Sequence, residues 1–263
     1  MELSVADLLN PAYQKLTDYT EPEDIKRFLF IKRHLESLGQ ETASLRVLDV
    51  GCGNGHISRG LARLGYSVVG VDIDPDSIKI AQEACPEASF FCLDVGDLAE
   101  QYASEHFHAI ICSEVLEHLE NPSEMVSTLY PFLAPDGILI VTTPNGFGPR
   151  ERTVTKPVQN LYRLGFGNAI GMAKKIMGYK GATSQSSNPD LTHIQFFTKQ
   201  ALIEAVNGEN NLELLEFGNA NYLEKAFPYS VKYKGNMQLK AEDCIRADSI
   251  PNEKASGWNT AWK

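Results

Sequence analysis

The stretch VLDVGCGNGH, Val47–His56, decides the fold of this chain. It is an apolar run with one acid, Asp49, that breaks into glycines at positions 51, 53 and 55, and a helix-like stretch follows it. A strand that passes through a glycine-rich turn into a helix presents free backbone N–H groups at the helix start, and glycine lets a ligand approach the backbone closely. This pattern predicts a nucleotide-like ligand at the end of the strand.

Apolar runs and helical stretches alternate around this motif. The runs cover residues 46–50, 67–73, 89–95, 108–115 and 137–145, and two further strand-like runs cover residues 212–217 and 256–263. Strands separated by helices imply a parallel sheet built from right-handed crossover units. Consecutive apolar residues, as in ILIV, are typical of strands covered on both faces. We therefore expect an α/β fold, a Rossmann-like seven-strand, mostly parallel sheet flanked by helices.

Two segments stand outside this alternation. Residues 1–43 are expected to form an N-terminal helical cap, with apolar positions at helical spacing and Gly39 ending the last helix, and residues 44–263 the main domain. After Pro144 the regularity stops for about 45 residues, which is long for a compact domain. We interpret residues 145–190 as an inserted lid, followed by a helix in the stretch 196–208 with Thr198 as its cap.

Composition excludes several classes of protein. The formal net charge of -10 disfavours general nucleic-acid binding, because that binding needs a basic face. No apolar run reaches the roughly 18 residues that a transmembrane helix needs, and the first ten residues carry no positive charge of the kind that begins a secretory signal. Five scattered cysteines without a C-x-x-C pair indicate neither a disulfide framework nor a zinc site. A cytoplasmic protein is expected.

The glycine motif discriminates between nucleotide cofactors. The dinucleotide fingerprint G-x-G-x-x-G requires a glycine where this chain has His56, whereas D-x-G-x-G-x-G, led by Asp49, matches. A carboxylate at this place opposes a pyrophosphate but suits a cationic amino group. S-adenosylmethionine (SAM) has such an amine and no phosphate.

On these residues the chain resembles the class I SAM-dependent methyltransferases from Leu45 onwards. The resemblance implies that the methionine end of SAM is held at Asp49, that Asp72 accepts the ribose hydroxyls and that Asp94 meets the adenine. The full set of implied cofactor-binding residues is Asp49, Gly51, Cys52, Gly53, Asp72, Ile73, Asp94, Val95 and Ser113. Acids that end successive strands lie at the edge where open α/β sheets bind ligands. Taken singly, each acid can instead cap the following helix.

The fourth strand runs into SEVLEHLENP, in which Glu114, Glu117 and His118 share one face if the segment is helical. The motif resembles the ubiquinone-biosynthesis O-methyltransferases and the small-RNA 2′-O-methyltransferases, in which E-x-x-E-H supplies metal ligands. With His193 as a further ligand, the resemblance implies a divalent metal, Mg²⁺ or Mn²⁺, held by Glu114, Glu117, His118 and His193.

Such an ion would lower the pKa of an acceptor hydroxyl and orient it for in-line displacement. Without a metal, His193 or His118 is the candidate catalytic base, because imidazoles titrate near neutral pH. The alternative is that the Glu-His pair only packs against the cofactor loop and His193 only caps the next segment.

The insertion carries seven basic residues against two acidic ones. Arg150 and Arg152 are candidate substrate residues that grip a phosphate or carboxylate, since arginine suits bidentate contacts. Alternatively, the basic amphipathic stretch 160–180 makes transient contact with a membrane, or the charges form a solvated face. This segment and the closing strand loosely resemble bacterial sugar-modifying methyltransferases.

The sequence therefore predicts a SAM-dependent O-methyltransferase acting on a hydroxyl of a small molecule, such as a sugar, a sugar nucleotide or a phenolic, catechol-like precursor. The alternatives are an RNA 2′-O-methyltransferase, a small-molecule N-methyltransferase and a SAM-binding subunit that does not catalyse.

Overall fold

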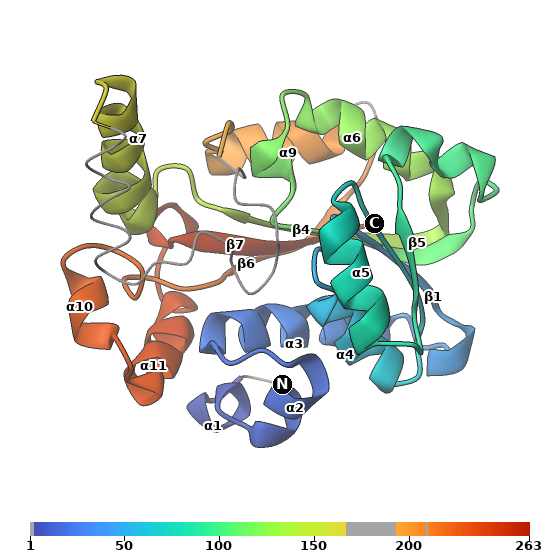
Figure 1. Cartoon of the computed structure of the whole chain (residues 1–263), viewed down its shortest axis with the longest axis horizontal. Coiled ribbons are helices and arrows are strands. Elements are labelled where there is room, and N and C mark those ends of the chain that lie inside the picture. The colour runs from blue at the N-terminus through green and yellow to red at the C-terminus, as the bar shows by residue number, and fades with distance from the viewer. Residues whose placement is uncertain (1–2, 167–192, 209) are drawn as a thin grey trace.

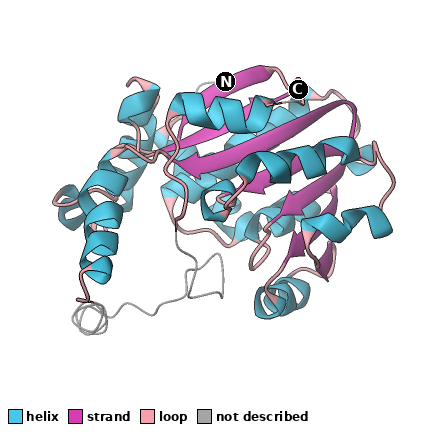
Figure 2. Ribbon diagram, turned by 90° about the horizontal axis from the view of Figure 1, so that it is seen from above, coloured by secondary structure: helices cyan, strands magenta, loops and turns pink. Residues whose placement is uncertain are grey.

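A computed structural model describes residues 3–166, 193–208 and 210–263, and in this part of the chain seven strands form one twisted sheet (Figure 2). The strands are β1 Arg46–Val50, β2 Ser67–Asp72, β3 Ser89–Cys92, β4 Phe107–Ser113, β5 Leu133–Pro144, β6 Leu214–Asn219 and β7 Gly257–Trp262. Their order is β3-β2-β1-β4-β5-β7-β6, and β7 runs antiparallel to both of its neighbours. The predicted seven-strand, mostly parallel sheet is confirmed.

Strand β1 lies where the order of the strands reverses. It pairs in parallel with β2 on one side and with β4 on the other, so Val50 lies between Val71 and Cys112. Open α/β sheets bind ligands outside the carboxyl ends of their strands at such a reversal. The ends of β1, β2 and β4 therefore converge on one place.

Helices cover both faces of the sheet (Figure 1). One face carries α3 Pro22–Ser37, α4 His56–Arg63, α5 Pro75–Ala84 and α11 Met237–Ala247, and the other α6 Pro122–Leu129, α9 Lys199–Asn207 and the 3-10 helix η2 Val95–Glu100. Each face has its own apolar core. The consecutive apolar residues of the strands serve both cores at once: Ile110 and Cys112 of β4 face one, and Ala109 and Ile111 the other.

The N-terminal helices form an additional layer on the α3 side. Helix α3 buries Ile25, Phe28, Ile31 and Leu35 at the predicted helical spacing, and these side chains join the core under the sheet. The short helices α1 Val5–Leu8 and α2 Pro11–Thr17 lie outside α3 (Figure 1). Gly39, with φ 67°, follows the end of α3, as expected for a helix stop.

The structure corrects three expectations. Residues 114–118 are not one helix, because Glu114 adopts φ 57° and only a 3-10 turn, η3 Leu116–His118, follows. The first part of the insertion is regular, with a π-helix η5 Glu151–Thr155 and α7 Lys156–Arg163, whereas residues 167–190 lie outside the described part. Helices α10 Tyr229–Tyr233 and α11 were not predicted.

Candidate active site

The glycine turn after β1 needs its glycines. Gly51, Gly53 and Gly55 have φ values of 64°, 50° and 76°, a region that side chains disfavour. A Cβ on Gly51 would lie 2.5 Å from Cγ2 of Val115, so this position has no room for one either. The turn therefore offers bare backbone at the carboxyl end of β1, before the start of α4.

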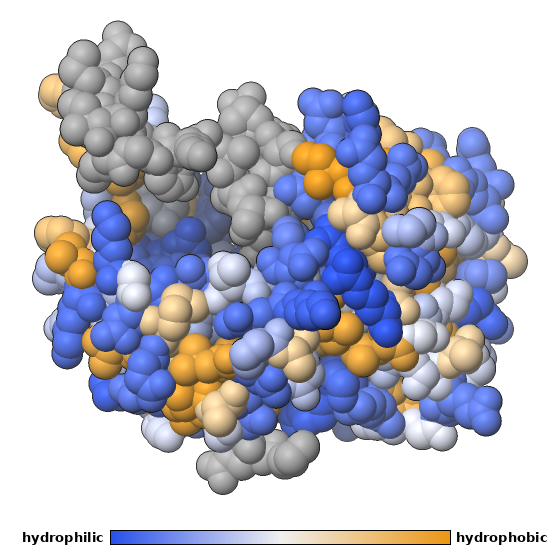
Figure 3. All heavy atoms as spheres, turned by 60° about the horizontal axis from the view of Figure 1, so that its bottom comes forward, coloured by the Kyte–Doolittle hydropathy of each residue, from blue (hydrophilic) through white to orange (hydrophobic). Residues whose placement is uncertain are grey.

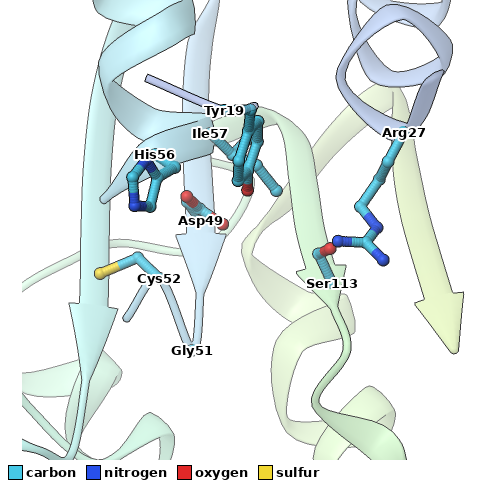
Figure 4. Close-up of a pocket in the computed structure, with 8 residues that line it drawn as sticks. All are labelled: Tyr19, Arg27, Asp49, Gly51, Cys52, His56, Ile57 and Ser113. Atoms are coloured by element: carbon cyan, nitrogen blue, oxygen red, sulfur yellow. The ribbon is translucent and has the colours of Figure 1, made fainter. Parts of the chain in front are cut away.

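A cavity of about 330 Å³, counting its open mouth, lies beside this turn (Figure 4). Its lining residues come from five parts of the chain: Tyr19, Arg27, Asp49, Gly51, Cys52, His56, Ile57 and Ser113. Four of them, Asp49, Gly51, Cys52 and Ser113, are among the predicted cofactor-binding residues. The structure thus brings four of the predicted cofactor-binding residues together at one cavity.

Asp49 is the buried acid of this cavity, with 1% of its surface exposed. The hydroxyl of Ser58 donates a hydrogen bond of 2.6 Å to Asp49 Oδ2. Burial raises the pKa of Asp49 to about 7, although the hydrogen bonds from Ser58 act in the opposite direction. A cation entering the cavity would meet a carboxyl that ionises near neutral pH.

Four cavity residues, Tyr19, Arg27, His56 and Ile57, were not among the predicted cofactor-binding residues. Figure 4 shows the Tyr19 ring over Asp49 and the Arg27 side chain reaching toward Ser113. Tyr19 stacks on His56 with ring centroids 4.9 Å apart. Arg27 is buried on α3 and contacts Asp24 at 3.1 Å. The available signal was a basic residue between Ile25 and Phe28 on the buried face of a predicted helix.

Asp72 and Asp94 both bond to backbone groups near their strand ends. Asp72 accepts hydrogen bonds from the N–H of Gly53 at 2.8 Å and from the N–H of Asp74 at 2.9 Å, which ties the glycine turn to β2. Asp94 accepts from the N–H of Gly96 at 2.8 Å and so caps η2. Their contacts with ribose and adenine stay predictions.

The adenine side of the predicted site offers apolar surface. Ile73 follows Asp72 and is 70% exposed, an unusual position for isoleucine, whereas Val95 is buried. A flat aromatic base lying on Ile73 would cover this surface.

Glu117, His118 and His193 converge next to the end of β4. One ligand atom from each lies within 4.8 Å of the others. The backbone N–H groups of Ile194 and Gln195 donate to the carbonyl of Glu117 at 2.8 and 2.9 Å. These bonds bring the segment that follows the insertion to this turn. Three of the four predicted metal ligands therefore meet.

Glu114 lies outside this cluster. Its Oε1 is 3.5 Å from Nη2 of Arg27 and accepts a hydrogen bond of 3.1 Å from the hydroxyl of Thr142. The physical reason is the backbone: the N–H of Glu114 bonds to the carbonyl of Thr142 at 2.9 Å, which extends the pairing of β4 with β5 and prevents a helix here. The expectation that Glu114, Glu117 and His118 share one helical face is wrong.

The donor set of the cluster fits a divalent cation. Glu117 is 1% exposed, and its Oε1 has no hydrogen-bond partner among the described residues, while Oε2 accepts from Thr143 at 3.2 Å. Burial and the neighbouring Glu114 raise the pKa of Glu117. One carboxylate and two imidazoles suit zinc, manganese or a similar ion with open positions for other ligands. An unpartnered buried oxygen is what such an ion would satisfy.

The two predicted substrate arginines differ in position. Arg150 is half-buried, and its charge acts on Glu23. Burial raises the pKa of Glu23, but the positive charges of Lys225, Arg27 and Arg150 outweigh this effect and lower the pKa to about 2. Arg152 is exposed. Only Arg150 therefore lies near the buried charges around Arg27.

Helix α7 projects from the body of the molecule (Figure 1). Large apolar side chains at its end are exposed, namely Leu161, Tyr162, Leu164 and Phe166. The face in Figure 3 mixes hydrophilic side chains with smaller apolar groups.

No helix within residues 3–166, 193–208 and 210–263 has the length and apolar character to cross a membrane.

Comparison with known proteins shows the family of this chain. The family model described as a methyltransferase domain matches residues 23–216, and the chain belongs to this family. Curated relatives include the ubiquinone biosynthesis O-methyltransferases of Xanthomonas axonopodis pv. citri and Xanthomonas oryzae pv. oryzae, 38% and 36% identical over 109 residues. These matches cover 40% of this chain and 45% of each relative, so the chain spans less than half the length of the relatives it matches.

Solved structures share the fold. A SAM-dependent methyltransferase from Methanosarcina mazei superposes with a TM-score of 0.54 at 19% identity, covering 86% of this chain and 95% of its own. A second, from Archaeoglobus fulgidus, has a TM-score of 0.54 at 16% identity, covering 90% and 94%. Similarity at this level concerns the fold alone.

Proposed function

We propose that this chain is a SAM-dependent O-methyltransferase acting on a hydroxyl group of a small molecule. One observation carries the proposal: the cavity around Asp49 and the cluster of Glu117, His118 and His193 lie at the ends of adjacent strands. Glu114 links them through its contact with Arg27 on the cavity side. A methyl donor and an acceptor would thus meet at the end of β4.

The cavity is complementary to the methionine part of SAM. Asp49 supplies a carboxylate for the amino group, and the Arg27 guanidinium supplies a cation for the carboxylate. The bare turn at Gly51 and Gly53 lets the cofactor approach the backbone. Asp72 would then face the ribose, and Ile73 and Val95 the adenine.

The cluster would hold and activate the acceptor. Methyl transfer is an in-line displacement, so the acceptor oxygen must be aligned and electron-rich. Glu117, His118 and His193 would hold a divalent metal, which, when bound, lowers the pKa of a coordinated hydroxyl. The imidazoles of His118 and His193 can accept the hydroxyl proton in its absence. Arg150 would attract an anionic group of the acceptor.

The acceptor class follows from two observations. The relatives named for ubiquinone biosynthesis favour a phenolic, catechol-like acceptor. The charged side chains near the cluster, including Arg27, Glu114 and Arg150, favour a polar acceptor such as a sugar or sugar nucleotide. Both kinds of molecule carry vicinal hydroxyls.

The test is a methyl-transfer assay with purified protein, radiolabelled SAM and a panel of catechols, sugars and sugar nucleotides, repeated with EDTA and with added Mn²⁺. Transfer to a hydroxyl, lost on chelation, is expected. Methylation confined to amines would overturn the choice of acceptor atom. Tight binding of S-adenosylhomocysteine (SAH) without transfer to any panel member would instead favour a SAM-binding subunit that does not catalyse.

A second candidate is an RNA 2′-O-methyltransferase, because Glu117, His118 and His193 converge as the resemblance to that branch implies. The net charge of -10 opposes it. A gel shift with short RNA at moderate salt tests it, and the absence of a complex would exclude this candidate.

A further inference from the structure

Glu151 is a buried acid that the proposed function does not use. Its side chain has an exposed fraction of 0%, and neither carboxylate oxygen has a hydrogen-bond partner among the described residues. An isolated buried charge is costly, so a buried carboxylate needs a partner. The question is which group in this part of the molecule supplies it.

A ring nitrogen of His193 faces this carboxylate. Nδ1 of His193 lies 3.5 Å from Oε1 of Glu151. Glu151 is the first residue of η5, near the start of the insertion, and His193 follows the end of the insertion. Gln159 of α7 donates a hydrogen bond of 3.1 Å to the carbonyl of His193, which holds that residue near the helical side of the insertion.

The anchoring of both flanks fixes this approach. The N–H of Gly146 bonds to the carbonyl of Phe197 at 2.9 Å, and the ammonium of Lys156 lies 3.9 Å from the ring centroid of Phe147 and 4.7 Å from that of Phe196. These contacts join the segment before η5 to the segment after His193. The Glu151–His193 pair therefore lies between two segments of the chain that these contacts hold together.

The geometry of imidazole determines what such a pair does. The two ring nitrogens point in different directions, and a group bonded at one fixes the tautomer at the other. A carboxylate at Nδ1 keeps the proton there and leaves the lone pair on Nε2. In metal sites and catalytic sites, this arrangement orients the ring and increases its basicity.

We propose that Glu151 is a positioning residue for His193. It accepts a hydrogen bond from Nδ1–H and holds the ring in the tautomer whose Nε2 lone pair is available to the cation or hydroxyl that Glu117 and His118 also bind. This role rests on the proposed function of the cluster. Glu151 touches neither the cofactor nor the acceptor in this assignment, and acts through His193 alone.

Arg150 and Thr155 lie near Glu151 as well. Arg150 carries a positive charge that also acts on this carboxylate. If Glu151 served only to neutralise Arg150, removing Glu151 would not change the tautomer of His193. The experiment must therefore report on the His193 ring itself.

The first measurement is NMR of protein labelled with ¹⁵N-histidine, which reads the tautomer of each ring without metal or cofactor. Wild type should show His193 protonated at Nδ1. Glu151→Gln keeps an acceptor oxygen and nearly the same volume, and should retain this tautomer. Glu151→Ala should shift His193 toward the Nε2–H tautomer, with His118 unchanged. An unchanged His193 signal in a folded Glu151→Ala protein would overturn the proposal.

The second measurement is Mn²⁺ binding by calorimetry. Glu151→Ala should weaken it by roughly 10- to 100-fold, the usual effect of losing such a partner, and Glu151→Gln by less. Glu120→Ala is the matched control, because it removes an exposed acid two positions from His118 and should leave binding unchanged. In a His193→Ala background, Glu151→Ala should cause no additional loss. An additional loss of the same size would contradict an action through His193.

Glu151→Gln serves as a second variant in case Glu151→Ala does not fold. If Glu151→Ala does not fold, the Gln variant still tests the proposal, because a Mn²⁺ affinity identical to wild type would count against a required carboxylate. SAH affinity, measured in parallel, separates the two hypotheses. Failure of wild type to bind SAH would overturn the proposed function, while the tautomer would still report on Glu151 and His193.

Discussion

Arg27 and Glu114 contact each other across the site, with Nη2 of Arg27 3.5 Å from Oε1 of Glu114. Arg27 comes from α3, and Glu114 follows β4. Because Arg27 lines the cavity and Glu114 precedes the histidine cluster, this pair connects the two halves of the proposed site. The Arg27 guanidinium is thus both the cation that lines the cavity and the ion-pair partner of the Glu114 carboxylate.

Arg27→Met should therefore destabilise the protein and weaken SAH binding by more than tenfold. Removing one member of a buried charge network leaves its partners uncompensated, which costs about 3–5 kcal/mol. Urea unfolding and calorimetry measure the two effects. The control is Arg33→Met on the same helix, whose exposed pair with Glu216, 2.8 Å apart, is worth no more than about 1 kcal/mol. Equal losses in both variants would contradict the role of Arg27.

Cofactor affinity should depend on pH through Asp49. Its pKa of about 7 is raised by burial, so below pH 7 the free protein holds Asp49 neutral. A cationic amine favours the carboxylate, so SAH binding should weaken by up to about tenfold for each pH unit below 7 and level off above it. Asp49→Asn should bind weakly at all pH values, and the same slope in that variant would assign the dependence to another group.

Asp72→Ala should weaken SAM binding by more than tenfold, because the variant loses the expected ribose contact and frees the N–H of Gly53. Asp74→Ala is a control two residues away. Asp74 caps α5 through the N–H of Ser77 at 3.2 Å, so its loss should cost about 1 kcal/mol of stability without a matching loss of affinity. An unchanged affinity of Asp72→Ala in calorimetry would remove the ribose assignment.

Gly51→Ala should abolish cofactor binding. Gly51 and Gly39 have nearly the same φ, 64° and 67°, so alanine meets the same backbone strain of about 1–2 kcal/mol at either position. Only at Gly51 does a Cβ meet Val115, whereas nothing lies within 4 Å at Gly39. Gly39→Ala should thus lose stability alone. SAH titration and thermal unfolding of both variants measure the difference.

Mn²⁺ should bind one-to-one, and the Glu117→Ala/His193→Ala double variant should lose this binding in calorimetry of the SAH complex. Glu114→Gln should retain it, because Glu114 lies outside the cluster. Loss of Mn²⁺ binding in Glu114→Gln would restore the four-ligand arrangement that the sequence motif implies. Absence of binding in wild type would leave a methyltransferase that uses histidine as its base.

The strands and the glycine turn were predictable because local patterns determine them. Runs of apolar residues report burial on both faces, and glycine at positive φ is a local requirement of the turn at Gly51, Gly53 and Gly55. The capping of α9 by Thr198 was predictable for the same reason: the side chain bonds to the N–H of Ala201, three residues away.

The parts that sequence reasoning missed depend on contacts distant in the chain. Tyr19 and Arg27 reach the cavity because α3 packs under the sheet, and Glu114 leaves the helix-like pattern because its backbone bonds to Thr142. The partner of His193 was equally hidden, since Glu151 lies far from it in the sequence. Contacts of this kind cannot be predicted from the spacing of residues along the sequence.

The position of β7 has a consequence for synthesis of the protein on the ribosome. Strand β6 is made before β7 but joins the sheet only through it, since β7 lies between β5 and β6. A nascent chain that has exposed β6 thus carries an unpaired strand until Gly257–Trp262 leaves the exit tunnel. Until then, the apolar surface that later buries Trp258 and Trp262 is open to chaperones, and the unpaired strand edge exposes a stalled chain to aggregation.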